Sequence, residues 1–433
     1  MNRILIAPDF ANLAESHRMV SFVKAFCKKK WEVFVMGKGT YDYLLEDYPI
    51  KRVYVAYDEE WFTPEKYVTM HSIDEEGFDY FTVDDLSRFV EEEKVIVSKV
   101  NPDIILTGYR LTISLTARVL KIPFVWLLSA VLSDMYFEKR LATMPHGCKI
   151  QSQLLKSLNE KQINEFFCKK IINTNLKSKN WSKYAKNIGI KPFKNDMEIF
   201  RGDYNIMADC PFLFPEFGQI MPYYSFCGPL LLDYKNEIPK SVLNYKKRDK
   251  KTIFFSMGSS GNPVLFKEMV NKLCKQTKYD IFIAISSLAT REELGEVPPN
   301  VIIEKMFPIP VVAALSDVAI THGGQGTLYS IIMKGLPFIG IPSFCEQQYN
   351  LETFARAGCG KVLQKDSSFD EIMYAVKEVL DNPNYKQNAV KVGNQINEYL
   401  DNLKVSPGER GTDGIIEFLE KYKENKNISY FSR

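Results

Sequence analysis

The chain has 433 residues, of which 45% are hydrophobic and 25% are charged, and its formal net charge is +3. This composition is that of a globular protein and excludes an intrinsically disordered chain, and the nearly balanced charge gives no general attraction to nucleic acid. Because a chain of this length exceeds one ordinary hydrophobic core, two domains of about 200 residues each are expected.

Eight cysteines are scattered along the chain without a Cys-x-x-Cys pair or a histidine at zinc-ligand spacing. Buried, reduced thiols in the cytoplasm are expected from such a pattern. No apolar run reaches the roughly 18 residues of a membrane-spanning helix, and the chain enters a strand almost at once. The sequence therefore predicts a cytoplasmic protein without a metal site.

The N-terminal part of the chain alternates strand and helix patterns around a polar loop at residues 9–16. Strands are expected at residues 3–8, 31–37, 104–107 and 123–128, and helices at residues 18–30 and 114–120. This order predicts a doubly wound domain, in which ligands bind at the carboxyl ends of parallel strands. Arg110, Asp134 and His146 follow such strands and are candidates for the acceptor side of a site.

Two segments of this part are strongly biased in charge. Residues 57–93 are acidic and contain several aromatic residues, including Trp61, whereas residues 149–194 are rich in lysine. Each bias is typical of a solvated face. The acidic segment would also suit the lining of a site for an apolar or cationic acceptor. The amphipathic, lysine-rich segment would also suit an anionic acceptor or peripheral contact with a membrane.

The second half repeats the alternation after a polar, lysine-rich linker at residues 232–251. A strand beginning at Thr252 runs into the small-residue turn Gly258-Ser259-Ser260, which precedes a helix. Such a turn exposes backbone N–H groups and is typical of an anion-binding site. Further strands are expected at residues 279–285 and 301–303.

A second glycine-rich turn follows the apolar run at residues 318–320. It contains His322, Gly323, Gly324, Gly326 and Thr327, and a helical pattern comes next. The free N–H groups and the dipole at the start of a helix suit a diphosphate, which glycines allow to approach closely. The imidazole can donate a further hydrogen bond, and the threonine can cap the helix or bind phosphate.

The next strand-like run, residues 338–342, is followed by Glu346 and Gln347. By β-α-β geometry this pair lies at the same edge of the sheet as the glycine-rich turn. A carboxylate and an amide there can bind two neighbouring sugar hydroxyls.

Residues 321–350 resemble the donor-binding signature of the UDP-glycosyltransferases, in the macrolide-glycosyltransferase-like branch of bacteria. That signature is His-Gly-Gly-x-Gly-Thr, then Gly-x-Pro, then Pro, then Asp/Glu-Gln-x-x-Asn. The resemblance implies the GT-B fold, an α/β architecture of two facing, Rossmann-like, doubly wound domains with a cleft between them. It implies an acceptor-binding domain at residues 1–231, a donor-binding domain at 252–415, and a final helix at 416–433 that packs back toward the first domain.

The resemblance also implies an inverting, metal-independent transfer of a hexose from a nucleoside-diphosphate sugar, with no other cofactor. The residues that would bind the diphosphate are Gly258, Ser259, Ser260, His322, Gly323, Gly324, Gly326 and Thr327. Glu346 and Gln347 would hold the sugar. Phe307, Pro308 and Ile309 would lie at the base. The resemblance makes UDP the default nucleotide. Because Ser330 occupies the place where the family commonly has a glutamate for the ribose, dTDP stays open.

The catalytic histidine–aspartate pair of the family is altered in this chain. Glu15 stands at the histidine position with His17 two residues later, and Gly108 appears in place of the aspartate. A carboxylate with a raised pKa or an imidazole can serve as general base, so both residues are candidates. Either could instead only cap the following helix.

Two other functions remain open. One is a pseudoenzyme that binds the donor and acts as partner of a true transferase, which the altered pair would suit. The other is an enzyme resembling the nucleotide-sugar 2-epimerases, which would need several acidic and histidine residues around the anomeric carbon. The acceptor is expected to be a hydrophobic or aromatic small molecule or a lipid, and the protein a monomer or homodimer.

Overall fold

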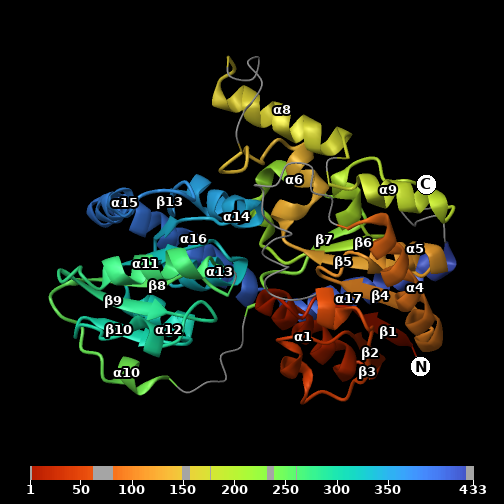
Figure 1. The fold of residues 1–433 in the computed structure, drawn as a ribbon, viewed down its shortest axis with the longest axis horizontal. Coiled ribbons are helices and arrows are strands. Elements are labelled where there is room, and N and C mark those ends of the chain that lie inside the picture. The colour runs from red at the N-terminus through yellow and green to blue at the C-terminus, as the bar shows by residue number, and fades with distance from the viewer. Residues whose placement is uncertain are drawn as a thin grey trace. The chain divides into compact units, whose positions relative to one another are not determined.

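A computed structural model describes residues 2–61, 81–148, 157–175, 177–231, 238–259 and 261–425, without the side chains of residues 59 and 61. The chain divides into two compact units, each with its own parallel sheet (Figure 1). The first unit comprises the described residues of Met1–Met144, Lys149–Leu230 and Leu403–Arg433, and the second those of Pro145–Cys148 and Leu231–Asn402.

The sheet of the first unit has seven parallel strands in the order β3-β2-β1-β4-β5-β6-β7. These strands are β1 (Arg3–Ile6), β2 (Glu32–Met36), β3 (Lys51–Val53), β4 (Ile104–Thr107), β5 (Phe124–Leu128), β6 (Tyr204–Met207) and β7 (Tyr224–Phe226). The strand order reverses between β1 and β4, where Ile6 pairs with Leu106. The carboxyl ends of these two strands therefore form the switch point at which doubly wound folds bind ligands.

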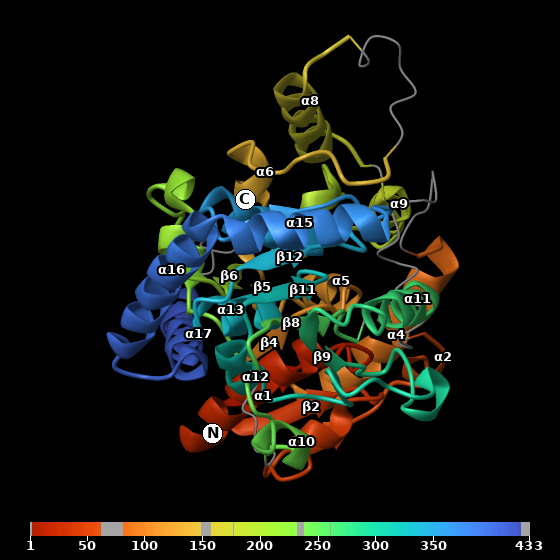
Figure 2. The same cartoon turned by 90° about the vertical axis from the view of Figure 1, so that its left-hand side faces the viewer.

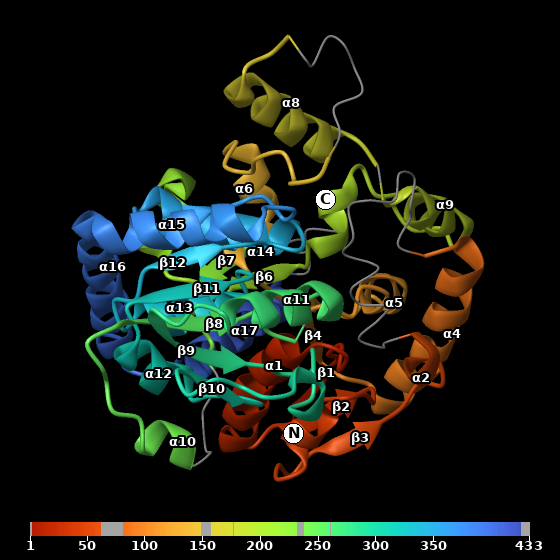
Figure 3. The same ribbon diagram turned by 60° about the vertical axis from the view of Figure 1, so that its left-hand side comes forward.

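The helices of the first unit are α1 (Leu13–Lys28), α2 (Asp58–Trp61), α4 (Val83–Val100), α5 (Ile113–Leu120), α6 (Asp134–Glu138), α8 (Glu160–Asn173), α9 (Lys179–Asn187) and α17 (Pro407–Glu424). Apolar residues of α1 and α17, such as Phe22 and Phe418, share one hydrophobic core with the strands. Figure 3 shows α4, α5 and α9 side by side, as their contacts require.

The second sheet has six parallel strands in the order β10-β9-β8-β11-β12-β13. These strands are β8 (Lys251–Ser256), β9 (Tyr279–Ala284), β10 (Val301–Glu304), β11 (Val318–Thr321), β12 (Phe338–Gly340) and β13 (Gly360–Val362). Here the order reverses between β8 and β11, where Ser256 pairs with Thr321. The second switch point therefore lies between the two glycine-rich turns.

The helices of the second unit are α10 (Lys240–Leu243), α11 (Pro263–Leu273), α12 (Ile309–Leu315), α13 (Gln325–Ile332), α14 (Cys345–Arg356), α15 (Phe369–Asp381) and α16 (Pro383–Asp401). Side chains alternate between the faces of a strand, so Ile253 and Phe255 join the core under α11 and α15. Phe254 instead contacts Phe307. Figure 2 shows α15 lying along β12.

Short 3-10 helices complete the chain. They are η1 (Asp42–Leu45), η2 (Ala130–Leu132), η3 (Asp196–Phe200), η4 (Pro211–Leu213), η5 (Pro215–Phe217) and η6 (Glu292–Leu294). None of the helices in the described parts of the chain is both long and apolar enough to cross a membrane.

Two helices begin earlier than the sequence pattern predicts. Helix α1 starts at Leu13 rather than near residue 18, because the Asn12 side chain accepts hydrogen bonds from the N–H groups of Ala14 and Glu15 and so caps it. Helix α17 starts at Pro407 and packs on α1. The structure thus groups the described residues from Leu403 onward with the first unit, whereas the donor-binding domain was expected to extend to residue 415.

The charged segments are described only in part, because residues 62–80 and 149–156 lie outside the described residues. Within the lysine-rich segment, α9 buries Trp181 and Tyr184 and exposes Lys179, Lys183 and Lys186. Helix α9 therefore exposes its lysine side chains to solvent and packs its aromatic residues inward.

Candidate functional site

The two glycine-rich turns of the second unit lie next to each other at the β8/β11 switch point. Gly258 and Gly324 both lie against the imidazole of His322. A Cβ atom on Gly258 would lie 2.4 Å from the ring Cε1, and one on Gly324 would lie 2.9 Å from Nε2. Gly258 also has a φ of +60°, which disfavours other residues. Both positions therefore need glycine to leave room for the histidine.

His322 is buried and uncharged at neutral pH. Its exposed fraction is 5%, and burial lowers its pKa from 6.5 to about 4, although contact with the Ser256 backbone opposes this shift. A neutral imidazole can donate one hydrogen bond without bringing a full charge into the site. The residue can therefore contact a phosphate as a hydrogen-bond donor at any pH well above 4.

Helix α13 begins in the same place. Its first residue is Gln325, and its N-cap, Gly324, provides no side-chain hydrogen bond to the first turn. A Cβ atom on Gly326 would have no neighbour within 4 Å, so the space beside this turn is open. Half-buried Thr327 lies in the same turn. The turn thus combines the positive end of a helix dipole with unhindered backbone, which is a suitable place for an anion.

The acid–amide pair is held against the second turn by α14. A Cβ atom on Gly323 would lie 2.6 Å from the backbone oxygen of Gln347, and the Asn350 side chain donates to the Gly323 oxygen (3.3 Å). The buried Gln347 side chain accepts from the Ser343 N–H (2.8 Å), and partly buried Glu346 lies in the first turn of the helix. The structure brings this pair and the glycine-rich turn together.

The residues expected near the nucleotide base are placed differently. The ring of Phe307 is 2% exposed and packs edge-on against Phe254 and Phe282, with centroids 6.3 and 5.7 Å away, so it offers no face for stacking. Pro308 caps α12, and Ile309 is its first residue. The neighbouring Met306 is 39% exposed.

Two further donor-side residues have restricted roles. The Ser330 hydroxyl donates to the Gly326 oxygen (2.7 Å) within α13, which leaves it less able to bind a ribose. Ser259 is described, and its backbone oxygen accepts from the Ser287 hydroxyl (3.2 Å), whereas Ser260 lies outside the described residues.

The β1/β4 switch point of the first unit holds a second cluster of polar groups. Glu15 lies in the first turn of α1, is 3% exposed and accepts a hydrogen bond from the Asp9 N–H (3.1 Å). A Cβ atom on Gly108 would lie 3.0 Å from Oε1 of Glu15 and 2.8 Å from the Met19 methyl group. The absence of a side chain at residue 108 therefore makes room for the glutamate carboxyl group.

Burial determines the protonation of these carboxyl groups. It raises the pKa of Glu15 well above its usual value, and the charge of Asp9 raises it further. Burial likewise raises the pKa of Asp9 from 3.8 to about 7, against hydrogen bonding from Ala11 and the charge of Arg110. Half-buried His17 lies two residues further along α1. Asp9 was missed from the sequence because it resembles an ordinary loop aspartate.

Comparison with known proteins identifies the fold and activity. A family model described as the erythromycin biosynthesis protein CIII-like C-terminal domain matches residues 270–399. A PGL/p-HBAD biosynthesis glycosyltransferase of Mycobacterium tuberculosis H37Ra is 26% identical over 400 residues, which cover 89% of this chain and 87% of that protein.

Solved structures show the same architecture. CalG4, the calicheamicin glycosyltransferase, has a TM-score of 0.67 at 14% identity, and the match covers 97% of this chain and 99% of that chain. The glycosyltransferase VinC, solved in complex with dTDP, has a TM-score of 0.60 at 16% identity over 97% of this chain and 100% of that chain. This chain is a glycosyltransferase of the GT-B fold.

Arg110 of the glycosyltransferase belongs to a buried polar network. Its guanidinium donates to Asp58 (2.7 Å), to the Tyr57 hydroxyl (2.9 Å) and to the backbone oxygen of Pro8 (3.2 Å). The Tyr57 hydroxyl in turn donates to Glu93 (2.5 Å). With an exposed fraction of 0%, Arg110 links the loop after β1 to the first residue of α2.

The remaining acceptor-side candidates are dispersed. Asp134 is buried, accepts from the Tyr224 hydroxyl (2.5 Å) and pairs with Arg201. His146 belongs to the second unit, where its backbone N–H donates to the Gln348 side chain (2.8 Å). Burial lowers the pKa of its imidazole. The side chain of Trp61 lies outside the described residues.

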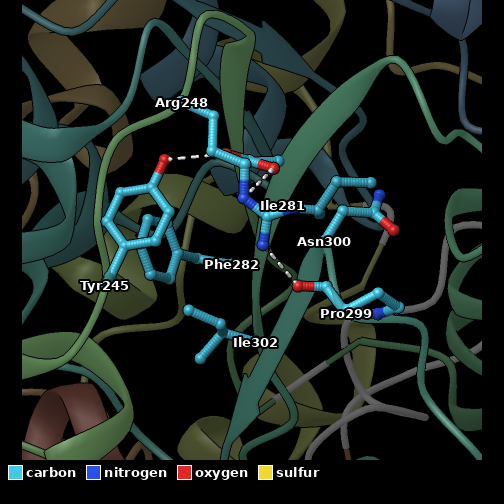
Figure 4. A pocket seen from close by; sticks show the side chains of 8 residues that line it. Tyr245, Arg248, Ile281, Phe282, Pro299, Asn300 and Ile302 are labelled. Carbon is cyan, nitrogen blue, oxygen red and sulfur yellow. Dashed lines mark hydrogen bonds and ion pairs between the residues drawn. The ribbon is translucent and has the colours of Figure 1, made fainter.

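A small pocket of the glycosyltransferase lies at the opposite edge of the second sheet, beside the first residues of β9 and β10 (Figure 4). It has about 20 Å³ of space for water-sized molecules, and its lining includes Tyr245, Arg248, Asp280 and Asn300. That space is enough for only one or two water molecules. Because the pocket lies at the amino ends of these strands, it is separate from the glycine-rich turns at the carboxyl ends of β8 and β11. Among the described residues, no group of three or more His, Cys, Asp or Glu side chains is placed to hold a metal ion.

Proposed function

We propose that this glycosyltransferase transfers a hexose from a nucleoside-diphosphate sugar to a hydroxyl group of a small-molecule, natural-product or lipid acceptor. The observation that carries this proposal is the arrangement at the β8/β11 switch point. There, neutral His322 and the unobstructed first turn of α13 lie together, beside the acid–amide pair. Hydrogen-bond donors of this kind suit a diphosphate, and the adjoining carboxylate and amide suit the hydroxyls of a hexose.

In the proposed reaction, Glu15 accepts the proton of the acceptor hydroxyl. The acceptor oxygen forms a bond to the anomeric carbon from the face opposite the nucleotide, and the bond from that carbon to the diphosphate oxygen breaks. The configuration at the anomeric carbon is thereby inverted. The nucleoside diphosphate leaves with the bonding electrons, and Glu15 later releases the proton to solvent.

Donors in the second unit would stabilise the departing diphosphate. The α13 dipole, its backbone N–H groups and the His322 imidazole would compensate the charge that develops on the leaving oxygen. Since the sequence also lacks an Asp-x-Asp motif, we propose that the reaction needs no metal ion. Transfer activity that survives treatment with EDTA would support this part of the proposal, and activity that is lost and then restored by Mg²⁺ or Mn²⁺ would refute it.

UDP is the proposed nucleotide because of the signature in residues 321–350, and dTDP is the alternative because VinC was solved with that nucleotide. Binding to the native state raises the melting temperature by mass action. Melting curves of the purified protein with UDP, dTDP, ADP and GDP at equal concentrations would identify the nucleotide. Stabilisation by none of the four would contradict the proposed donor site.

Glu15 is proposed as the general base in preference to His17, because Gly108 leaves the space that its carboxyl group occupies and burial raises its pKa. A general base contributes about 10²–10⁴ to the rate. E15Q should therefore lower the turnover by at least roughly 100-fold, and H17A by less than about tenfold. The opposite ranking would assign the role to His17.

The altered catalytic pair also favours a second candidate function, that of a donor-binding pseudoenzyme. UDP-glucose or dTDP-glucose hydrolysis by the purified protein, followed as release of the nucleoside diphosphate, separates the two functions. A transferase should release the nucleotide slowly in water and faster with a reactive acceptor such as 4-nitrophenol. Tight binding of both donors with no release under any condition would favour the pseudoenzyme.

A further inference from the structure

Asp9 lies beside the proposed base and has no role in the function proposed above. The loop that carries it is fixed on two sides, because Asp9 Oδ1 accepts from the Ala11 N–H (2.8 Å) and the Arg110 guanidinium donates to the Pro8 oxygen (3.2 Å). Asp9 is 2% exposed. Its carboxyl group is therefore held in one place and shielded from water.

The carboxyl group of Glu15 is held beside the Asp9 loop. One oxygen, Oε1, accepts from the Asp9 N–H, and the Tyr109 backbone N–H also favours the ionised carboxylate, while the other oxygen, Oε2, is buried without a hydrogen bond of its own among the described residues. The carboxyl group also lies close to Gly108, where an added Cβ atom would come within 3.0 Å of Oε1. An unpartnered, buried carboxylate oxygen is costly, whereas the same oxygen can carry a proton or accept one from a substrate.

The surrounding charges do not neutralise both carboxyl groups. Arg18 favours the ionised form of Glu15, and Arg110 favours that of Asp9. Arg110, however, already donates to Asp58, whose own negative charge opposes ionisation of Asp9. Because burial and mutual repulsion outweigh the effect of these two arginines on the pKa values of both carboxyl groups, a single proton on the pair is favoured.

We propose that Asp9 and Glu15 act as one carboxyl pair, in which Asp9 is a positioning residue that sets when Glu15 is ionised, and Gly108 supplies the space for the pair. This inference rests on the proposed role of Glu15 as base. With one proton on Asp9, Glu15 is ionised and can accept the proton of the acceptor hydroxyl. The pair then changes from one negative charge to none, which burial favours.

The pair is tested by infrared difference titration of protonated carboxyl groups in the full-length protein. In the wild type, two steps are expected that belong to the pair rather than to either residue, because the charge of each carboxyl group opposes ionisation of the other. D9N removes the Asp9 charge and should lower the midpoint of Glu15 by at least about one pH unit, the size expected of interacting sites. E15Q should lower the midpoint of Asp9 in the same way. Both substitutions are isosteric, and if one variant does not fold, the other carries the test.

D203N is the matched control, because Asp203 is also a buried carboxylate of the first unit, 3% exposed and hydrogen-bonded to the Phe124 N–H. It should leave both midpoints unchanged. A remaining carboxyl group that titrates at its wild-type midpoint in D9N and in E15Q would overturn the pair.

Hydrolysis of UDP-glucose gives an independent kinetic readout. The acidic limb of kcat/KM should move to lower pH in D9N, which a purely structural role of Asp9 would not cause. Reciprocal shifts in the titration together with wild-type turnover by E15Q would overturn the proposed base and leave the carboxyl pair intact. An unshifted limb in an active D9N protein would overturn the role of Asp9 while leaving the transferase function intact.

Discussion

The imidazole of His322 connects the donor site to the acid stability of the protein. Its folded-state pKa of about 4 lies below its usual 6.5, so the unfolded chain takes up a proton at a higher pH than the native protein does. This contribution to stability is fully present above pH 6.5 and is lost as the pH falls toward 4. The 2.5-unit difference corresponds to roughly 3 kcal/mol.

H322Q should therefore reduce the loss of stability between pH 7 and pH 4.5, measured as the free energy of unfolding in urea. H17Q, at a half-buried histidine of the first unit, is the control and should keep most of the loss. Because the wild-type imidazole is neutral throughout, nucleotide affinity should show no His322 titration between pH 6 and 8. Equal acid losses in H322Q and the wild type would contradict a buried neutral histidine.

Gly108 is predicted to tolerate no side chain. In G108A, the new Cβ atom would lie 2.8 Å from the Met19 methyl group and 3.0 Å from Glu15, so the glutamate must move. Overpacking of this kind costs about 1–3 kcal/mol of stability, and a displaced catalytic group costs up to roughly 100-fold in rate. G414A, which crowds only the Tyr204 hydroxyl at 2.7 Å, should lose stability with little loss of kcat. Equal losses of kcat in both variants would show that Gly108 has no special relation to Glu15.

At the level of single residues, the sequence drew attention to Glu15 and Gly108 because both positions depart from the family pattern. Their proposed roles stay predictions. Asp9 had no such marker, because only the fold reveals that its carboxyl group is buried next to Glu15. Phe307 was expected to stack on a base, but the core between Phe254 and Phe282 takes up its ring.

Helix α13 allows stability and ligand binding to be separated within one element. Gly326 lies in its first turn, has no positive φ and would place a Cβ atom in open space. Alanine is about 1 kcal/mol more favourable than glycine inside a helix, so G326A should stabilise the protein by up to that amount. The added methyl group would stand where the diphosphate is proposed to bind and should weaken nucleotide affinity by tenfold or more.

Gly258 provides the contrast to Gly326. G258A would place its Cβ atom 2.4 Å from the His322 ring at a φ of +60°, so both stability and nucleotide affinity should fall. Calorimetric titration with UDP and thermal melting distinguish the two outcomes. A G326A protein that binds UDP as tightly as the wild type would exclude the first turn of α13 from the diphosphate site.

Element positions were predictable where the hydrophobic pattern was strong. The strands expected at 104–107 and 301–303 match β4 and β10 to within one residue. The start of α1 was not predictable from apolar periodicity, because the Asn12 cap and a polar first turn determine it. This difference moves Glu15 from a loop onto a helix, where its backbone is fixed.

At the scale of the whole chain, the GT-B architecture of two parallel sheets followed from the alternating pattern and the donor signature. The assignment of α17 to the first unit depends on contacts between residues far apart in sequence, which a pattern alone does not specify. The ring of Phe418 stacks on Tyr204 with centroids 5.2 Å apart, and Ile415 and Leu419 join the core shared with α1. The last helix of the first unit therefore follows the second unit in the sequence.

This connectivity predicts that the two units respond to different perturbations. F418A removes a ring that is 8% exposed and should destabilise the first unit by about 3 kcal/mol, the lower range for such substitutions. A nucleoside diphosphate at 100 times its Kd should stabilise the second unit by about 2.7 kcal/mol. Differential scanning calorimetry of F418A should therefore show an early transition that UDP does not move and a later one that UDP raises. A Kd for UDP weakened more than about threefold by F418A, or an early transition that follows the UDP concentration, would contradict donor binding by the second unit alone.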